Sequence, residues 1–128
     1  MRCLIDTSTF LWFISGDSRL SHKSKTIISE IDNEIFLSIA SLWEIAIKMS
    51  IAKLELSMSY EDLLSTQIED NEIKLLQIEK NHLRKLVRLP LYHRDPFDRL
   101  IISQGIAENL PILTCDRFFN DYPVEISW

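Results

Sequence analysis

Short apolar segments of strand type alternate with helical segments along almost the whole chain. Apolar runs with the length and β-former content of buried strands cover residues 2–6, 34–39, 73–78, 111–116 and 124–128. The segments between most of them show helical spacing of apolar residues or begin with a capping serine. Alternation of this kind favours a parallel sheet with helices on both faces. The sequence therefore predicts an α/β fold.

Helices are expected over six ranges, and their ends carry recognisable signals. Ser21 and Ser59 have the position of N-caps, Gly16 ends the first helix, and Pro90 stops the fifth. The six ranges are residues 8–15, 20–32, 41–49, 59–71, 81–90 and 96–109. With two glycines, four prolines and no linker or repeat, the 128 residues are expected to form a single domain, 1–128.

Composition excludes several classes of protein. The longest apolar runs are broken well before the roughly 20 residues that span a bilayer, and the N-terminus has no signal-peptide core. We therefore expect a cytoplasmic protein that does not associate with a membrane. Two cysteines are too few for a disulfide scaffold, so Cys3 and Cys115 are expected to be buried, reduced and unbridged. A net charge of −5 disfavours broad, nonspecific binding of nucleic acid.

Two of the predicted strands end in an aspartate. Asp6 closes the first strand and Asp116 closes the fourth. Ligands of parallel α/β sheets bind beyond the carboxyl ends of the strands, so both acids are candidates for a site. An aspartate in this position can equally cap the next helix or form an Asx-turn.

Glu44 is a third candidate, shortly after the second strand. It would project from the same edge of the sheet as Asp6. The spacing Ser41-x-x-Glu44 also matches a capping box, and Glu44 can pair with Lys48 one helical turn later. From spacing alone, these two structural interpretations are the stronger ones.

The stretch "HRDPFDRL", residues 93–100, places two further acids three residues apart. Asp95 fits an N-cap, Pro96 fits the first helical position, and Asp98 falls in the first turn, where acids complement the helix dipole. Residues i and i+3 share one helix face, so both carboxylates can point the same way. If this helix begins at the carboxyl edge, they would meet the other acids.

Several carboxylates in one place repel each other unless a cation joins them. Oxygen ligands suit hard ions, so Mg²⁺ or Mn²⁺ is expected rather than zinc. The two cysteines supply no thiolate motif, and the histidines show no paired metal spacing. His22 and His82 are interpreted as exposed helix residues, and His93 alone lies near the acids.

Four motifs in order, "LIDTS", "SLWEIAIK", "HRDPFDRLIISQ" and "ILTCDRFFNDY", give the chain a family resemblance over its whole length. It resembles PIN-domain ribonucleases, specifically the VapC-like toxins of bacterial type II toxin–antitoxin pairs. The resemblance implies a PIN-like α/β/α sandwich with a central, mostly parallel sheet of four to five strands. It also implies a Mg²⁺- or Mn²⁺-dependent endoribonuclease that hydrolyses RNA, binds a cognate antitoxin protein and forms a homodimer.

The resemblance also assigns residues. The catalytic and metal-binding set would be Asp6, Glu44, Asp98 and Asp116. Supporting residues would be Thr114 in the "T-x-D" motif, with Thr7, Ser8 and Asp95; Asp95 is additional to the four-acid pattern. Candidate phosphate contacts are Arg94, Arg99, Arg117 and Lys48, although each is also interpretable as a solvated charge or part of a dimer salt bridge.

Two other functions stay open at this point. A PIN fold can serve as a catalytically inactive module that binds protein or RNA, although the complete acid set argues against it. An aspartyl phosphatase or phosphotransferase would use Asp6 as its nucleophile. Such sites need a second acid beside the nucleophile, and here the neighbours are Thr7 and Ser8.

Overall fold

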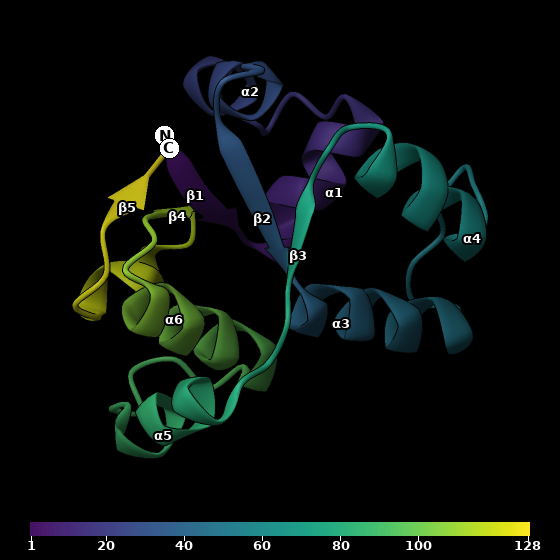
Figure 1. Cartoon of the computed structure of the whole chain (residues 1–128). Coiled ribbons are helices and arrows are strands. Elements are labelled where there is room, and N and C mark those ends of the chain that lie inside the picture. The colour runs from purple at the N-terminus through teal and green to yellow at the C-terminus, as the bar shows by residue number, and fades with distance from the viewer.

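Five short strands form one parallel sheet at the centre of the chain (Figure 1). The computed structural model describes residues 1–128. The strands are β1 (Arg2–Ile5), β2 (Glu34–Ser38), β3 (Lys74–Leu76), β4 (Ile112–Leu113) and β5 (Ile126–Ser127). Their order is β3-β2-β1-β4-β5, and every neighbouring pair is parallel. The predicted α/β fold class is confirmed, with the first strand in the middle of the sheet.

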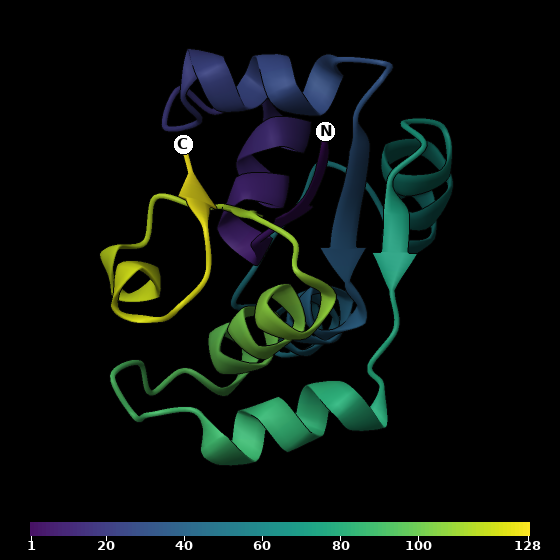
Figure 2. The same cartoon turned by 60° about the vertical axis from the view of Figure 1, so that its left-hand side comes forward.

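Helices cover both faces of the sheet. Figures 1 and 2 show α1 and α2 on one side and α6 on the other, with α5 lying outside α6. The helical elements are α1 (Thr7–Ser15), α2 (His22–Ser29), α3 (Ile39–Ser50), α4 (Tyr60–Asp62) continued by the π-helical η1 (Leu63–Glu69), α5 (Lys80–Arg88), α6 (Pro96–Glu108) and the 3-10 turn η2 (Arg117–Asp121). None of these helices combines the length and the apolar character that a membrane span requires.

Alternation along the strands separates two apolar clusters. On β1, Cys3 and Ile5 join the larger cluster with Phe10 of α1, whereas Leu4 faces the smaller cluster with Ile101 of α6. The short strands β2 and β4 divide their residues between the two clusters in the same way. Because successive side chains of a strand point to opposite faces, near-continuous apolar runs are what a doubly covered sheet requires.

Two of the predicted serine caps and the glycine stop are confirmed, and one cap is corrected. Ser21 and Ser59 accept backbone hydrogen bonds at the starts of α2 and α4, and Gly16 ends α1 with a φ of 67°. The helix α3, however, begins at Ile39 and is capped by Ser38, whose side chain accepts the Ala40 N–H. Ser41 lies inside the helix, so the capping box proposed for it does not form.

The cysteine prediction is half right. Both thiols are free, and Cys3 is buried in the sheet, but Cys115 is exposed. The strand β4 ends at Leu113, which pairs with Ile5, so Thr114 rather than Asp116 lies level with Asp6. The chain leaves the sheet before Cys115, which removes that residue from the buried layer.

His82 is also corrected, since it is fully buried rather than exposed. Its Nδ1 accepts the backbone N–H of Glu79, and its Nε2 lies 2.8 Å from Glu108 Oε1. These contacts join the beginning of α5 to the end of α6. His22 is exposed, as predicted.

Gly105 allows α6 to approach β4 closely, and replacing it with alanine is expected to destabilise the fold. A Cβ at this position would lie 2.8 Å from Ile112 Cδ1 and 3.1 Å from Val124 Cγ2. Alanine normally stabilises a helix interior, but here overpacking should lower the free energy of unfolding by about 1–3 kcal/mol. Urea denaturation of Gly105→Ala measures this. Equal or greater stability would show that Ile112 and Val124 repack without cost.

Candidate functional site

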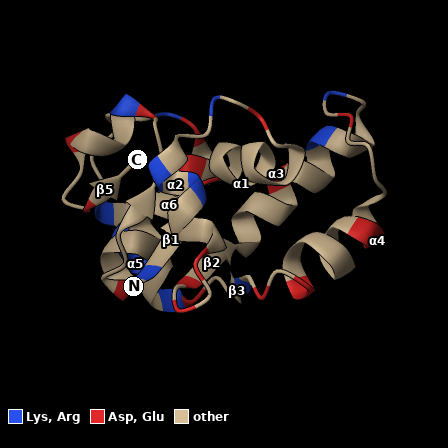
Figure 3. Cartoon of the chain, turned by 90° about the horizontal axis from the view of Figure 1, so that it is seen from above, with Lys and Arg blue, Asp and Glu red and all other residues tan.

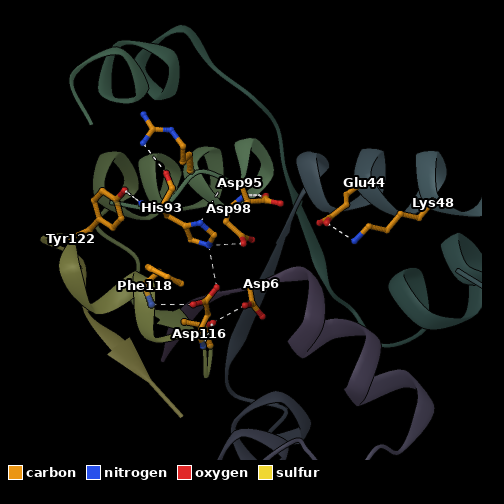
Figure 4. A network of polar contacts seen from close by, with 11 residues as sticks. Asp6, Glu44, Lys48, His93, Asp95, Asp98, Asp116, Phe118 and Tyr122 are labelled. Atoms are coloured by element: carbon orange, nitrogen blue, oxygen red, sulfur yellow. Dashed lines mark hydrogen bonds and ion pairs between the residues drawn. The ribbon is translucent and has the colours of Figure 1, made fainter. Parts of the chain in front are cut away.

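The four predicted acids all lie at the carboxyl edge of the sheet (Figure 4). Asp6 directly follows β1, and Glu44 lies in the second turn of α3, which follows β2. Asp98 is in the first turn of α6, and Asp116 lies three residues beyond β4. Parallel strands bring their carboxyl ends to one edge, so the topology gathers residues that are distant in sequence.

The tightest part of the cluster is built around a histidine. His93 Nε2 lies 2.9 Å from Asp98 Oδ2 and 3.1 Å from Asp116 Oδ2. Ligand atoms of these three residues all lie within 4.8 Å of one another. His93 joins two acids here that the sequence had placed in separate segments.

Asp6 is held beside this group by threonines. The Thr114 hydroxyl donates a 2.6 Å hydrogen bond to Asp6 Oδ2 and accepts the backbone N–H of Asp116 at 3.1 Å. The Thr9 N–H donates to Asp6 Oδ1 at 2.9 Å. Burial raises the pKa of Asp6 above its usual value, the nearby Asp116 charge adds to the rise, and the threonine hydrogen bonds oppose it.

Asp98 shows how crowded the acids are. Burial, followed by the charges of Asp95 and Asp6, raises its pKa to about 7, while the charge of His93 opposes the rise. A carboxyl group in these surroundings gives up its proton readily only when a cation is near.

Glu44 lies on the same edge but faces Lys48 (Figure 4). Lys48 Nζ is 2.8 Å from Glu44 Oε2, the i,i+4 pair expected as one alternative, and this hydrogen bond raises the pKa of Lys48. The other oxygen, Oε1, is buried without a hydrogen-bond partner. A buried carboxylate oxygen without a partner is costly, so it marks a position suited to a cation.

Three of the acids also cap the helical segment that follows them, as their spacing suggested. Asp6 caps α1, Asp95 caps α6 by accepting the Asp98 N–H at 2.9 Å, and Asp116 caps η2 by accepting the Phe118 N–H at 3.0 Å. A cap uses one carboxylate oxygen and leaves further lone pairs free. Capping and cation binding are therefore compatible in the same side chain.

The supporting residues differ in what they contact. Thr114 contacts Asp6 directly, whereas the Thr7 hydroxyl donates to Ser41 and joins α1 to α3, and Ser8 is exposed. Sequence reasoning missed Thr9, although the N-cap rule places the third helical residue opposite its cap. It also gave His93 no role in the site, although the histidine opens the same short motif as Asp95 and Asp98.

The candidate phosphate contacts are not equally available. Arg99 donates to the backbone carbonyls of Leu89, Pro90 and His93 at 2.9–3.2 Å, so its guanidinium is committed to the loop before α6. Lys48 is paired with Glu44. Arg94 and Arg117 are exposed and form no ion pair. These two arginines are the cations free to meet an incoming anion.

The donor set as a whole fits a hard divalent cation. Its members are carboxylates beside the imidazole of His93, one carboxylate has a buried oxygen that lacks a partner, and no thiolate takes part. Oxygen donors of this kind suit Mg²⁺ and Mn²⁺. Asp6, Asp98, Asp116 and Glu44 are the residues that could hold such an ion.

Comparison with solved structures finds the same fold in bacterial complexes. VapBC2 of Rickettsia felis, bound to a DNA fragment from its promoter, has a TM-score of 0.74 at 16% identity and covers 100% of this chain and 99% of its own. FitAcB of Neisseria gonorrhoeae has a TM-score of 0.70 at 16% identity, covering 98% and 96%. VapBC-5 of Mycobacterium tuberculosis, a member of the VapBC family of toxin–antitoxin systems, has a TM-score of 0.61 at 16% identity, covering 98% and 95%.

Comparison by sequence gives a single clear result. None of the curated proteins compared with the chain matches it significantly. The model of the PIN domain family matches residues 3–125, which include β2, β3, β4, all of β1 but its first residue, and all the acids described above; β5 lies just beyond the match. The sheet order, the acid cluster at its carboxyl edge and this match agree, and the chain belongs to the PIN domain family.

Proposed function

We propose that this chain is a divalent-metal-dependent endoribonuclease, the toxin of a toxin–antitoxin pair. The single observation that carries the proposal is the carboxylate cluster at the carboxyl edge of a PIN-family sheet. Ligand atoms of Asp98 and Asp116 lie close together, and Asp6 lies beside them. Glu44 has a buried carboxylate oxygen without a hydrogen-bond partner. Placing these acids close together is electrostatically unfavourable. An unfavourable cluster of this kind supports a binding function rather than a purely structural one.

The proposed chemistry is hydrolysis of an RNA phosphodiester. A divalent ion held by the acids would lower the pKa of water and neutralise phosphate oxygens. Asp6, Asp98, Asp116 and Glu44 would hold and orient it, and exposed Arg94 and Arg117 would contact the flanking phosphates. Acidic and basic residues are interspersed over the elements seen from above (Figure 3), and the net charge is −5. Recognition of RNA by one broad basic face is therefore not part of the proposal.

The partner proposals rest on the resemblance and on the solved relatives. The VapBC and FitAcB structures have nearly the same length and fold as this chain. By analogy, a small antitoxin protein would bind this chain and neutralise it, and two copies of the chain would form a homodimer. Size-exclusion chromatography with light scattering tests the dimer.

The two competing functions have less support. An inactive binding module would not need to keep four acids converging at one edge. For an aspartyl phosphatase, Asp6 would need a second acid directly beside it in the sequence, and its neighbours are Thr7 and Ser8. A trapped phosphoenzyme would reopen this possibility.

Replacing Asp98 with asparagine should abolish RNA cleavage. Asparagine keeps the shape but loses the negative charge, and a bound ion is worth several kcal/mol of transition-state stabilisation, so we expect a loss of at least about 100-fold. The measurement is the cleavage rate of a labelled single-stranded RNA in Mg²⁺ or Mn²⁺, with EDTA and a DNA strand of the same sequence as controls. Metal-independent cleavage, or full activity of Asp98→Asn, would contradict the proposal.

Asp95 provides the matched comparison, because it lies three residues away and is chiefly a cap. Asp95→Asn should cleave RNA at nearly the wild-type rate, since asparagine caps a helix about as well as aspartate. Asp95→Ala should lower the free energy of unfolding by about 1 kcal/mol. If Asp95→Asn is as inactive as Asp98→Asn, both acids serve the metal.

The stability of the chain should depend on pH through Asp98. The folded chain holds this proton more tightly than the unfolded chain, because the pKa is about 7 in the fold against 3.8 for the free group. The contribution of Asp98 to stability is therefore complete below about pH 4 and is lost as the pH rises through about 7.

We expect Asp98→Asn, measured by denaturation without divalent ions, to exceed the wild type in stability at about pH 8. The gain should be about 1–3 kcal/mol after allowance for solvent screening, and it should shrink toward about pH 5. Mg²⁺ should raise the melting temperature of the wild type and leave that of Asp98→Asn nearly unchanged. Equal responses of both proteins to Mg²⁺ would place the ion elsewhere.

A further inference from the structure

His93 lies between two carboxylates, and its two ring nitrogens have different partners. Nε2 faces Asp98 Oδ2 and Asp116 Oδ2, at 2.9 Å and 3.1 Å. Nδ1 lies 3.3 Å from the backbone nitrogen of Asp95, whose N–H points at it and donates to it. Figure 4 shows the ring between Asp98 and Asp116, with its Nε2 side toward both acids.

The contact at Nδ1 decides which nitrogen carries the hydrogen. A nitrogen that accepts a backbone N–H must present its lone pair, so Nδ1 carries no hydrogen in this arrangement. The hydrogen is then on Nε2, where it donates to Asp116 Oδ2 at 3.1 Å and lies beside Asp98 Oδ2 at 2.9 Å. An Nε2 atom that bears hydrogen has no lone pair for a cation. His93 therefore contacts the acids as a donor, even though its distance to them would also suit a ligand.

The ring is held in this orientation from several sides. The backbone N–H of His93 donates to the Tyr122 hydroxyl at 2.7 Å, and that hydroxyl donates to the Pro90 carbonyl at 2.7 Å. The rings of Phe118 and Phe119 lie 5.1 Å and 6.0 Å from the imidazole, centroid to centroid. The histidine side chain is only 13% exposed. Turning the ring to exchange its nitrogens would break the Asp95 contact and disturb this packing.

We propose that His93 is a positioning residue for the divalent ion, acting through Asp98 and Asp116, and is not itself a ligand. The inference rests on the proposed metal-dependent function. The Nε2–H donates to Asp116 and places its positive end 2.9 Å from Asp98, between two carboxylates that would otherwise repel each other, and both keep lone pairs for an ion. Hydrogen bonds that orient ligating carboxylates typically contribute about 10–100-fold to metal affinity.

The opposite assignment makes a different prediction. If His93 were a ligand, Nε2 would give up its hydrogen, Nδ1 would carry one, and the Asp95 amide would lose its acceptor. An imidazole ligand would also shift the preference of the site from Mg²⁺ toward transition metals. The tautomer of His93, with and without metal, therefore separates the two assignments.

The first test is two-bond ¹H–¹⁵N correlation spectroscopy of the full chain labelled at histidine, with His93 assigned by comparison with His93→Gln. We expect the Nε2–H form without metal and the same form with saturating Mg²⁺. A change to the Nδ1–H form on adding Mg²⁺ would overturn the inference.

With Mn²⁺, pulsed electron paramagnetic resonance should detect no directly coordinated ¹⁴N. A coordinated-nitrogen signal that disappears in His93→Gln would overturn the inference as well.

The second test is the affinity of the chain for Mg²⁺ and Mn²⁺, measured by calorimetry. Glutamine can present an amide N–H near the position of Nε2, so His93→Gln should bind within a few-fold of the wild type. His93→Leu fills the space without a donor and should bind at least about tenfold more weakly. Exposed His22→Leu is the matched control and should bind like the wild type. Circular dichroism and melting temperature verify that each variant is folded.

The outcomes separate this inference from the proposed function. Wild-type affinity in folded His93→Leu would overturn the positioning role and leave the nuclease proposal intact. Failure of the wild-type chain to bind either ion would overturn the proposed function and the positioning role with it. Binding without RNA cleavage would overturn only the nuclease proposal.

Discussion

The hydrogen bond from the Thr114 hydroxyl to Asp6 joins residues 108 positions apart in the sequence, and the arrangement of the carboxyl edge depends on it. It continues the pairing of β1 with β4, where Ile5 is aligned with Leu113. The same hydroxyl accepts the Asp116 N–H, so one side chain sets the positions of two acids. Replacing Thr114 with a residue that lacks the hydroxyl would leave the buried Asp6 with one fewer hydrogen-bond donor. This would lower the free energy of unfolding by about 1–3 kcal/mol.

Mutual repulsion of the acids is opposed mainly by hydrogen bonds within the chain. Asp6 and Asp116 accept backbone N–H groups at the starts of the segments that follow them, and Asp95 does the same for α6. His93 adds a donor between Asp98 and Asp116, and Lys48 pairs with Glu44. Capping of helical segments and pairing with nearby side chains thus fix where these carboxylates point before any ion takes part.

Sequence periodicity was sufficient for the fold because its signals are local. Five apolar runs separated by capped helices specify a doubly covered parallel sheet, and the carboxyl-edge rule then places Asp6 and Asp116 together. The Asp95 cap was also predictable, because N-cap spacing is a property of four consecutive residues, here 95–98.

The remaining details depend on register and tertiary contact, which local spacing does not encode. Ser38 rather than Ser41 caps α3 because β2 ends at Ser38, one residue before its apolar run does, and the helix begins at once with Ile39. Cys115 is exposed because β4 has only two residues. The exposure of His82 and His93 depends on tertiary packing. Both are covered by segments that follow them in the sequence.

The central place of β1 has a consequence for the growing chain. The first strand emerges from the ribosome long before β4, its neighbour on one side, is synthesised. The contact of Asp6 with Thr114 cannot form until Thr114 has been synthesised, and Asp98 likewise cannot meet Asp116 before Asp116 is added. A nascent chain that does not yet include Thr114 and Asp116 has no completed cluster. The time needed to synthesise the segment from Asp6 to Asp116 is therefore a built-in delay between the start of translation and the formation of the acid centre.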